Sequence, residues 1–343
     1  TVMDVSFGFR QAAKLGARRP KEWVSGMRWG MRMIRNEADG LALDAAQRAD
    51  DRLVTVVTPD GIEEIPFGRI QTESADILRP IPGTPEAEAA GILTREESAI
   101  TNKLSRIWVI KQSQQSFVLA LNKMRGDVLW QFVKMAEKQG RPITPEFLRD
   151  MGNLLNRMTG RGELGQNWLA KAMKQLGFAP GYRISGPQMV MQLAHRGKPH
   201  SSFIRRQAAE SLAAWFGAGI SLMGTAKVTG VADRLGLDPL SSDFGKIGIG
   251  PVRYNVWGTD VVLARHIAQY IWQTRRDPLT GAGKVARGDV FWRYVRSGAD
   301  PNVGTVVDLG TGKNFLGEPA GFNLKTLRRE IENSFPLGLQ DIK

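Results

Sequence analysis

The sequence predicts a mainly α-helical protein, a multi-helix assembly with one or two small β-hairpins. Apolar residues recur at three- or four-residue steps over long stretches, and two short segments instead alternate β-branched residues with turn residues. Of the 343 residues, 42% are hydrophobic and 24% are charged, which is typical of a globular protein and excludes a wholly disordered or fibrous one. The length predicts one large domain or two modest ones.

The first predicted segment, residues 1–84, combines an amphipathic helix with a hairpin. Between Arg19 and Arg35, Trp, Met and Ile alternate with Arg and Lys, which predicts a helix that packs on the core or lies on a partner or a membrane surface. A β-branched run, a Thr-Pro-Asp-Gly turn and a second apolar run predict a hairpin at residues 52–67. The Pro- and Gly-rich residues 79–85 then interrupt regular structure and mark a boundary.

The second predicted segment, residues 85–240, is helical. Thr94 and Glu97 form a capping box, and the apolar spacing behind them predicts one long helix to Met135, with Gly126 as the point where an interruption is expected. The polar run 111–116 is expected to face solvent, a lumen or a neighbouring subunit. A Thr-Pro-Glu sequence at 144–146 opens a helix that should end at Gly160 or Gly162. Short helices are predicted at residues 168–176 and 187–193.

A stretch without charges, residues 211–226, lies near the end of this segment. As a helix it would be about 24 Å long, shorter than the bilayer's hydrocarbon core of about 30 Å, so a buried helix is expected rather than a constitutive membrane span. Its Gly residues would permit close helix packing in protein or in lipid. The candidates for helix packing or membrane contact are Trp215, Phe216, Gly217, Gly219, Leu222 and Gly224.

The chain is strongly basic, and the charge is regional. Its 47 Lys and Arg against 34 Asp and Glu give a net charge of +13, which favours nucleic acid, anionic lipid or an acidic partner. Residues 51–100 have 4 basic and 10 acidic residues, whereas residues 101–200 have 16 basic and 5 acidic residues. Cations near short helices and glycine turns are candidates for contact with nucleic-acid phosphates: Arg157, Arg161, Lys171, Lys174, Arg183, Arg196, Lys198, Arg205 and Arg206.

The residues available for catalysis are few. The chain has no Cys and three His, which excludes disulfides, thiolate nucleophiles and Cys-ligated metals and disfavours a multi-histidine site. The two Gly-x-Gly-Lys sequences, at 281–284 and 310–313, lack the Ser or Thr and the spacing of a phosphate-binding loop. We therefore expect no catalytic residue, no metal and no cofactor, and a chain that is not itself an enzyme.

The third predicted segment, residues 241–343, carries a specific order of motifs. Ser-Ser-Asp-Phe-Gly-Lys-Ile-Gly-Ile-Gly (241–250) and Val-Arg-Tyr-Asn-Val-Trp-Gly (252–258) predict a second hairpin near residues 246–257, followed by an amphipathic helix at 261–271. Val-Phe-Trp-Arg-Tyr-Val-Arg (290–296) and Val-Asp-Leu-Gly-Thr-Gly-Lys-Asn-Phe-Leu-Gly-Glu-Pro (307–319) come next. This succession resembles the large polyvalent protein-associated domains of very long phage proteins, including internal virion and DNA-ejection proteins.

The resemblance covers about residues 160–319 and implies a role in structure and delivery. Such a chain would lie in the capsid interior or the portal and tail region and would pass to the host cell envelope or cytoplasm. The implied partners are further copies of the chain, portal or other virion core proteins, packaged double-stranded DNA and the host membrane. It implies no catalytic residue. The alternatives are a non-catalytic accessory segment of a large virion enzyme (an RNA polymerase, antirestriction or cell-wall-cleaving protein) and a nonspecific DNA-binding protein.

Overall fold

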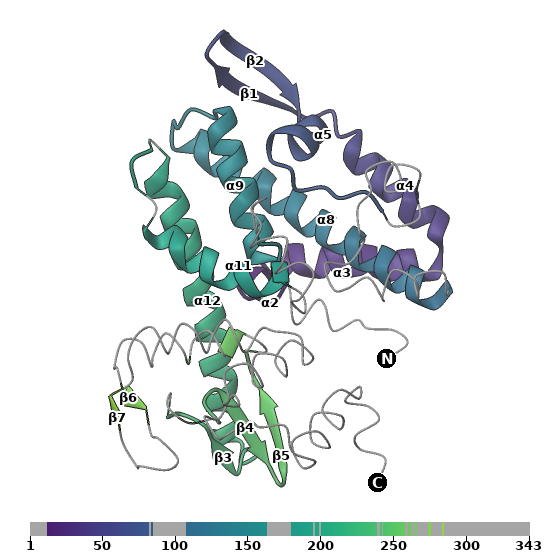
Figure 1. The fold of residues 1–343 in the computed structure, drawn as a ribbon. Coiled ribbons are helices and arrows are strands. Elements are labelled where there is room, and N and C mark those ends of the chain that lie inside the picture. Colours follow the sequence, from purple (N-terminus) through teal and green to yellow (C-terminus); the bar gives the residue numbers. More distant parts are fainter. Residues whose placement is uncertain are drawn as a thin grey trace, which may run out of the picture.

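The computed structural model describes residues 12–81, 84, 108–162, 180–194, 196–198, 200–238, 241, 243–257, 260–261, 265, 274–275 and 283–284 (Figure 1). This part of the chain is 65% helical with small antiparallel sheets, which confirms the predicted mainly α fold class. The helices are α2 (Ala13–Arg18), α3 (Pro20–Arg35), α4 (Glu37–Arg48), α5 (Phe67–Arg69), α8 (Trp108–Lys138), α9 (Pro145–Met158), α11 (Pro180–Met191) and α12 (Ser201–Val228), with a π-helical turn (Ile70–Ser74) and a 3-10 turn (Gln192–Ala194). The strands are β1 (Leu53–Thr58), β2 (Gly61–Pro66), β3 (Arg234–Leu235), β4 (Lys246–Ile249), β5 (Val252–Asn255), β6 (Thr274–Arg275) and β7 (Gly283–Lys284).

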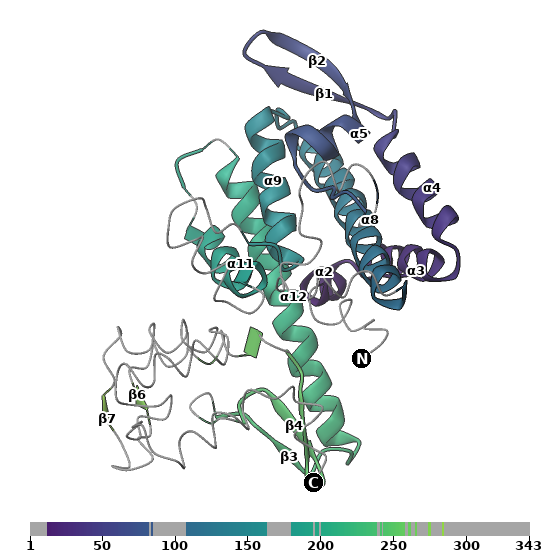
Figure 2. The same cartoon turned by 45° about the vertical axis from the view of Figure 1, so that its right-hand side comes forward.

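The main body of the molecule is built around α8. Helices α3 and α4 lie on one side of α8 and α9 on the other (Figures 1 and 2). Phe132 of α8, Phe147 of α9 and Phe203 of α12 meet in the core, with ring centroids 6.3 Å apart for Phe132–Phe203 and 5.6 Å for Phe147–Phe203. Buried aromatic pairs of this kind add to the hydrophobic stabilisation, so these rings join three helices into one body.

The α9 helix and the first hairpin form where the sequence predicts them. The Thr144 hydroxyl accepts a hydrogen bond from the Phe147 amide (3.2 Å), and Pro145 occupies the first helical position. The helix ends before Gly160, whose φ of 80° is a left-handed conformation that favours glycine. Strands β1 and β2 pair from Leu53↔Pro66 to Thr58↔Gly61, with Val54 and Val56 buried in the core.

Helix α8 differs from the prediction in two respects. It is continuous through Gly126, and the side chains of Gln47 and Gln71 fill the space where a Cβ of residue 126 would lie. The polar run is not exposed: Gln112, Gln114, Gln115 and Ser116 are buried. Gln115 Nε2 donates a hydrogen bond to Glu37 Oε1 (2.8 Å), so α4 of the same chain takes the place of the expected solvent, lumen or subunit.

Helix α12 leads from the main body to a small second module. Its first half contributes Phe203, Ile204 and Ala208 to the main core, and its second half packs on the three-stranded sheet β3-β4-β5 (Figure 1). Strands β4 and β5 pair from Lys246↔Asn255 to Ile249↔Val252, which confirms the second predicted hairpin; β3 was not predicted. No helix within the described ranges is long and apolar enough to span a bilayer.

Helix α2 lies at the junction of the body and the module. Leu15 belongs to the main core, whereas Ala13 and Ala17 pack on the second cluster, which contains Trp215, Met223, Ile247 and Trp257. Lys14 Nζ lies 2.8 Å from Asp260 Oδ2, and both side chains are almost fully buried. The short helix α2 is thus tied, near the start of the described chain, to Asp260, which lies five residues after the end of β5.

Some predictions lie outside the described residues. These are the helix at 168–176, the beginning of the long helix before residue 108, most of the helix at 261–271, and the motifs at 290–296 and 307–319. The helix predicted at 187–193 is part of α11 and of the 3-10 turn, and α11 begins earlier, so that Pro187 lies inside it.

Candidate nucleic-acid interface

Helix α3 is held on α8 through two glycines one turn apart. A Cβ on Gly26 would overlap with the Met124 side chain and approach the Ala120 carbonyl oxygen to 2.7 Å, and a Cβ on Gly30 would lie 3.0 Å from the Ser116 carbonyl oxygen. Only glycine permits so close an approach of two helix backbones. The buried side of α3 is therefore fixed against α8, and its opposite side is turned to solvent.

The outer side of α3 carries a row of cations, which we call the α3 basic row: Lys21, Arg28, Arg32 and Arg35. All four are exposed. At about 100° per residue their positions fall within an arc of about 60°, and at about 1.5 Å per residue the row is about 21 Å long. In the part of the chain that the structure describes, none of these four cations forms an ion pair. Among the described residues, the row is therefore a line of positive charge without an acidic partner.

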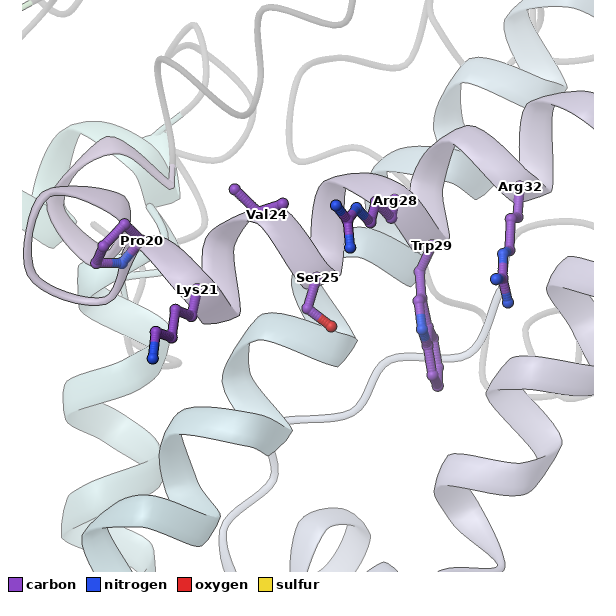
Figure 3. Close-up of a pocket in the computed structure, with 7 residues that line it drawn as sticks. All are labelled: Pro20, Lys21, Val24, Ser25, Arg28, Trp29 and Arg32. Atoms are coloured by element: carbon purple, nitrogen blue, oxygen red, sulfur yellow. The ribbon is translucent and has the colours of Figure 1, made fainter.

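A shallow hollow of about 540 Å³ follows the same helix. The described residues that line it are Pro20, Lys21, Val24, Ser25, Arg28, Trp29 and Arg32 (Figure 3). Trp29 lies between Arg28 and Arg32 in this view, and Lys123 Nζ of α8 is 4.6 Å from its ring centroid. This cation–π contact ties Trp29 to α8, so the surface beneath the cations is supported by the core.

Three of the nine predicted phosphate contacts are engaged in ion pairs within the chain. Arg161 lies 2.8 Å from Asp76, Lys198 lies 2.9 Å from Asp150, and Arg206 lies 2.6 Å from Glu210. A carboxylate partner lowers the net charge that each cation offers to a phosphate. These three positions are therefore weaker anion sites than their place in the sequence indicates.

The other six predicted contacts include three that the structure describes. Arg196 is exposed, whereas Arg157 and Arg205 are half-buried with their Nε atoms fully covered. Lys171, Lys174 and the side chain of Arg183 lie outside the described residues. Phosphate binding at these nine residues stays a prediction. The predicted phosphate contacts did not include the α3 basic row. Its members are seven, four and three residues apart in the sequence, a spacing that places them on one face of a helix.

The predicted packing or membrane candidates on α12 divide between two faces of the helix. Trp215 is buried and Phe216 packs beside it, with ring centroids 4.8 Å apart. A Cβ on Gly219 would overlap with the Trp257 indole, so Gly219 is a close-packing position. Gly217 and Gly224 face open space and Leu222 is 55% exposed. The expectation of a buried helix is wrong for the face that carries Gly217 and Gly224, because the sheet covers the opposite side; Leu222 lies at the edge of the covered side.

A polar cluster joins α9 to the start of α12. Asp150 Oδ2 lies 2.7 Å from His200 Nε2 and 2.9 Å from Lys198 Nζ. Burial alone would raise the pKa of Asp150, but the hydrogen bonds from His200 and Lys198 outweigh it and hold that pKa below its ordinary value. The Ser201 hydroxyl accepts a hydrogen bond from the Lys198 amide (3.0 Å). The cluster thus ties the turn before α12 to α9.

Comparison of the chain with protein-family models, with curated proteins and with solved structures found no match. Among the residues described, no group of three His, Asp or Glu side chains is placed to hold a metal ion. The α3 basic row is the arrangement with the clearest chemistry: it attracts anions.

Proposed function

We propose that this chain is a structural segment of an internal virion protein of a tailed phage, an ejection protein that helps to package the genome or to deliver it through the portal, tail and host envelope. The motif resemblance over residues 160–319 supports the phage setting. The contact with the genome is supported by the α3 basic row, whose four exposed cations lie on one helix face and form no ion pair among the described residues. The proposed role is binding and assembly without catalysis.

The α3 basic row suits the backbone of duplex DNA. Duplex DNA carries one negative charge for about every 1.7 Å of its axis, and cations that neutralise phosphates gain affinity by releasing bound counterions. A row about 21 Å long on one helix can lie along a phosphate strand without entering a groove. Such a contact is independent of sequence, as packaging or delivery of a whole genome requires. Portal or other core proteins and further copies of the chain are the other proposed partners.

Salt dependence of duplex binding by the full chain tests this proposal. In the double variant Arg28→Gln/Arg32→Gln, the slope of log affinity against log salt should become shallower by about 1.8, at about 0.9 for each lost phosphate contact. The matched control is Arg69→Gln, because Arg69 is an exposed arginine that lies 2.8 Å from Glu73 and 4.0 Å from Glu63.

The control should leave the slope unchanged. If the double variant retains the wild-type slope, or if the full chain does not bind duplex DNA at low salt, the α3 basic row is not a DNA contact and the proposed function loses its structural support. Circular dichroism of each variant checks that the helical content is retained.

A further inference from the structure

The far end of the small module presents an exposed apolar surface made by two adjacent turns. One turn follows α12 and the other connects β4 to β5 (Figure 1). We call this surface the module tip; its apolar residues are Val228, Val231, Ile249, Pro251 and Val252. Val228 is 89% exposed and Val231 is 52% exposed. Exposed aliphatic side chains gathered on one projection indicate a contact surface rather than scattered surface residues.

Hydrogen bonds fix the two turns side by side and satisfy two of their backbone amides. The Asp233 amide donates to the Gly248 carbonyl (2.9 Å), and the Gly250 amide donates to Asp233 Oδ2 (2.5 Å). Gly250 has a φ of 57°, as required by a two-residue hairpin turn with glycine at its first central position. A backbone that is already hydrogen-bonded can enter an apolar medium at a lower cost.

Three cations lie close to the module tip in the described structure. Lys227 and Arg234 are exposed, and in the described structure neither forms an ion pair. Arg253 is half-buried and lies 3.7 Å from Asp243, so its charge is partly compensated. The acid at the tip itself is Asp233, which accepts the hydrogen bond from Gly250. Apolar side chains with net positive charge beside them match the interface of an anionic bilayer, which has acyl chains inside and negative headgroups at its surface.

We propose that the module tip inserts into the headgroup region of an anionic lipid bilayer. Duplex DNA is a poorer occupant, because it offers no apolar phase to cover five aliphatic residues. The contact is interfacial, and it uses residues beyond the charge-free stretch 211–226. The delivery role proposed above provides its biological setting, but the surface is separate from the α3 basic row, so either proposal can fail alone.

Vesicle binding by the full chain tests the apolar part of the proposal. Co-sedimentation with vesicles of phosphatidylcholine alone and with one-third phosphatidylglycerol should show stronger binding to the anionic set. The variant Val228→Asp/Val252→Asp should lower partitioning into anionic vesicles by at least about tenfold. The matched control is Ile62→Asp, because Ile62 is an aliphatic residue on the β1–β2 hairpin that is 75% exposed.

The control should bind like wild type. The proposal is overturned if the tip variant also binds like wild type, if Ile62→Asp loses as much binding, or if the wild-type chain binds neither vesicle. Thermal unfolding of each variant confirms folding; should the double variant unfold, Val231→Ser replaces it, with the same direction of effect expected.

The charged rim gives a second, independent readout. Lys227→Gln and Arg234→Gln should each weaken binding to the anionic vesicles by about fivefold and leave binding to neutral vesicles unchanged. Duplex DNA affinity should not change in any tip variant. If tip variants lose DNA binding while keeping lipid binding, the module tip is a nucleic-acid surface and the lipid proposal is wrong.

Discussion

The Asp150 carboxylate shows how single side chains fix the turn before α12. It receives hydrogen bonds from Lys198 and His200, and these hold its pKa below the ordinary value although burial acts in the opposite direction. A pKa lowered on folding means that ionised Asp150 stabilises the folded state above the ordinary carboxyl pKa of about 3.9. That stabilisation is lost as the pH falls through the lower folded-state pKa.

We predict that Asp150→Asn lowers the free energy of unfolding by about 1 to 3 kcal/mol at pH 7, because two charge-assisted hydrogen bonds are lost. The difference from wild type should stay level down to about pH 4 and shrink below it. Urea unfolding from pH 7 to pH 3 measures this. As a control, Asp51→Asn changes an exposed acid and should alter the free energy of unfolding by less than about 0.5 kcal/mol. If the loss of stability in Asp150→Asn is as large at pH 3 as at pH 7, the ionised carboxylate is not its cause.

At the scale of elements, the close packing of α3 on α8 positions the α3 basic row. Gly26 and Gly30 allow the two helices to approach until a Cβ would meet backbone carbonyl groups of α8. Backbone atoms cannot move aside as a flexible side chain does, so larger residues must separate the helices.

We predict that Gly26→Ala destabilises the chain by about 1 to 3 kcal/mol in urea unfolding, in spite of the higher helix propensity of Ala. Gly217→Ala on α12 is the matched control, since a Cβ there meets nothing within 4 Å. It should stabilise by up to about 1 kcal/mol. Equal effects of the two substitutions would show that the approach of α3 to α8 is not sterically limited.

Local sequence signals predicted several elements well. These signals are local in sequence: the Thr-Pro-Glu start of α9, the turn residues at 58–61 and the apolar periodicity of α3. Because each acts within a few residues, the elements could be predicted without knowledge of the tertiary structure. The burial of Gln115 was not accessible, because its hydrogen-bond partner Glu37 is 78 residues away. The exposed face of α12 was missed for the same reason: only the fold shows which side the sheet covers.

The same limit applied to the candidate site. The sequence showed that the chain is basic, but the ion pairs of Arg161, Lys198 and Arg206 depend on acids brought close by folding. The α3 basic row lacks such partners among the described residues. The total charge could therefore be predicted from the sequence, whereas only the structure shows which cations lack an acidic partner among the described residues.

At the scale of the whole molecule, α2 and α12 join two hydrophobic clusters. The main core combines Val54 and Phe67 with Val128 and Phe203, from both sides of the predicted boundary at residue 84, while the division into three segments stays a prediction. The buried Lys14–Asp260 pair lies at the junction of the two clusters. Loss of one partner of a buried pair leaves an uncompensated charge, which is more costly than loss of both.

We predict that Lys14→Met destabilises the chain by about 3 to 5 kcal/mol and that Lys14→Met/Asp260→Leu recovers most of this loss. A double-mutant cycle in urea gives the coupling energy. Trp215 and Trp257 of the second cluster are two of the nine tryptophans that contribute to the fluorescence change on unfolding. Additive effects of the two substitutions would mean that the ion pair does not connect body and module.

The central claim is that the chain is carried in a virion and leaves with the genome. Cryo-EM of intact and emptied virions, with quantification of the chain in both, tests this most directly. We expect density for the fold of Figure 1 in the capsid interior or the portal and tail region of intact particles, and its loss after genome release. Absence of the chain from intact particles, or an unchanged amount after release, would contradict it.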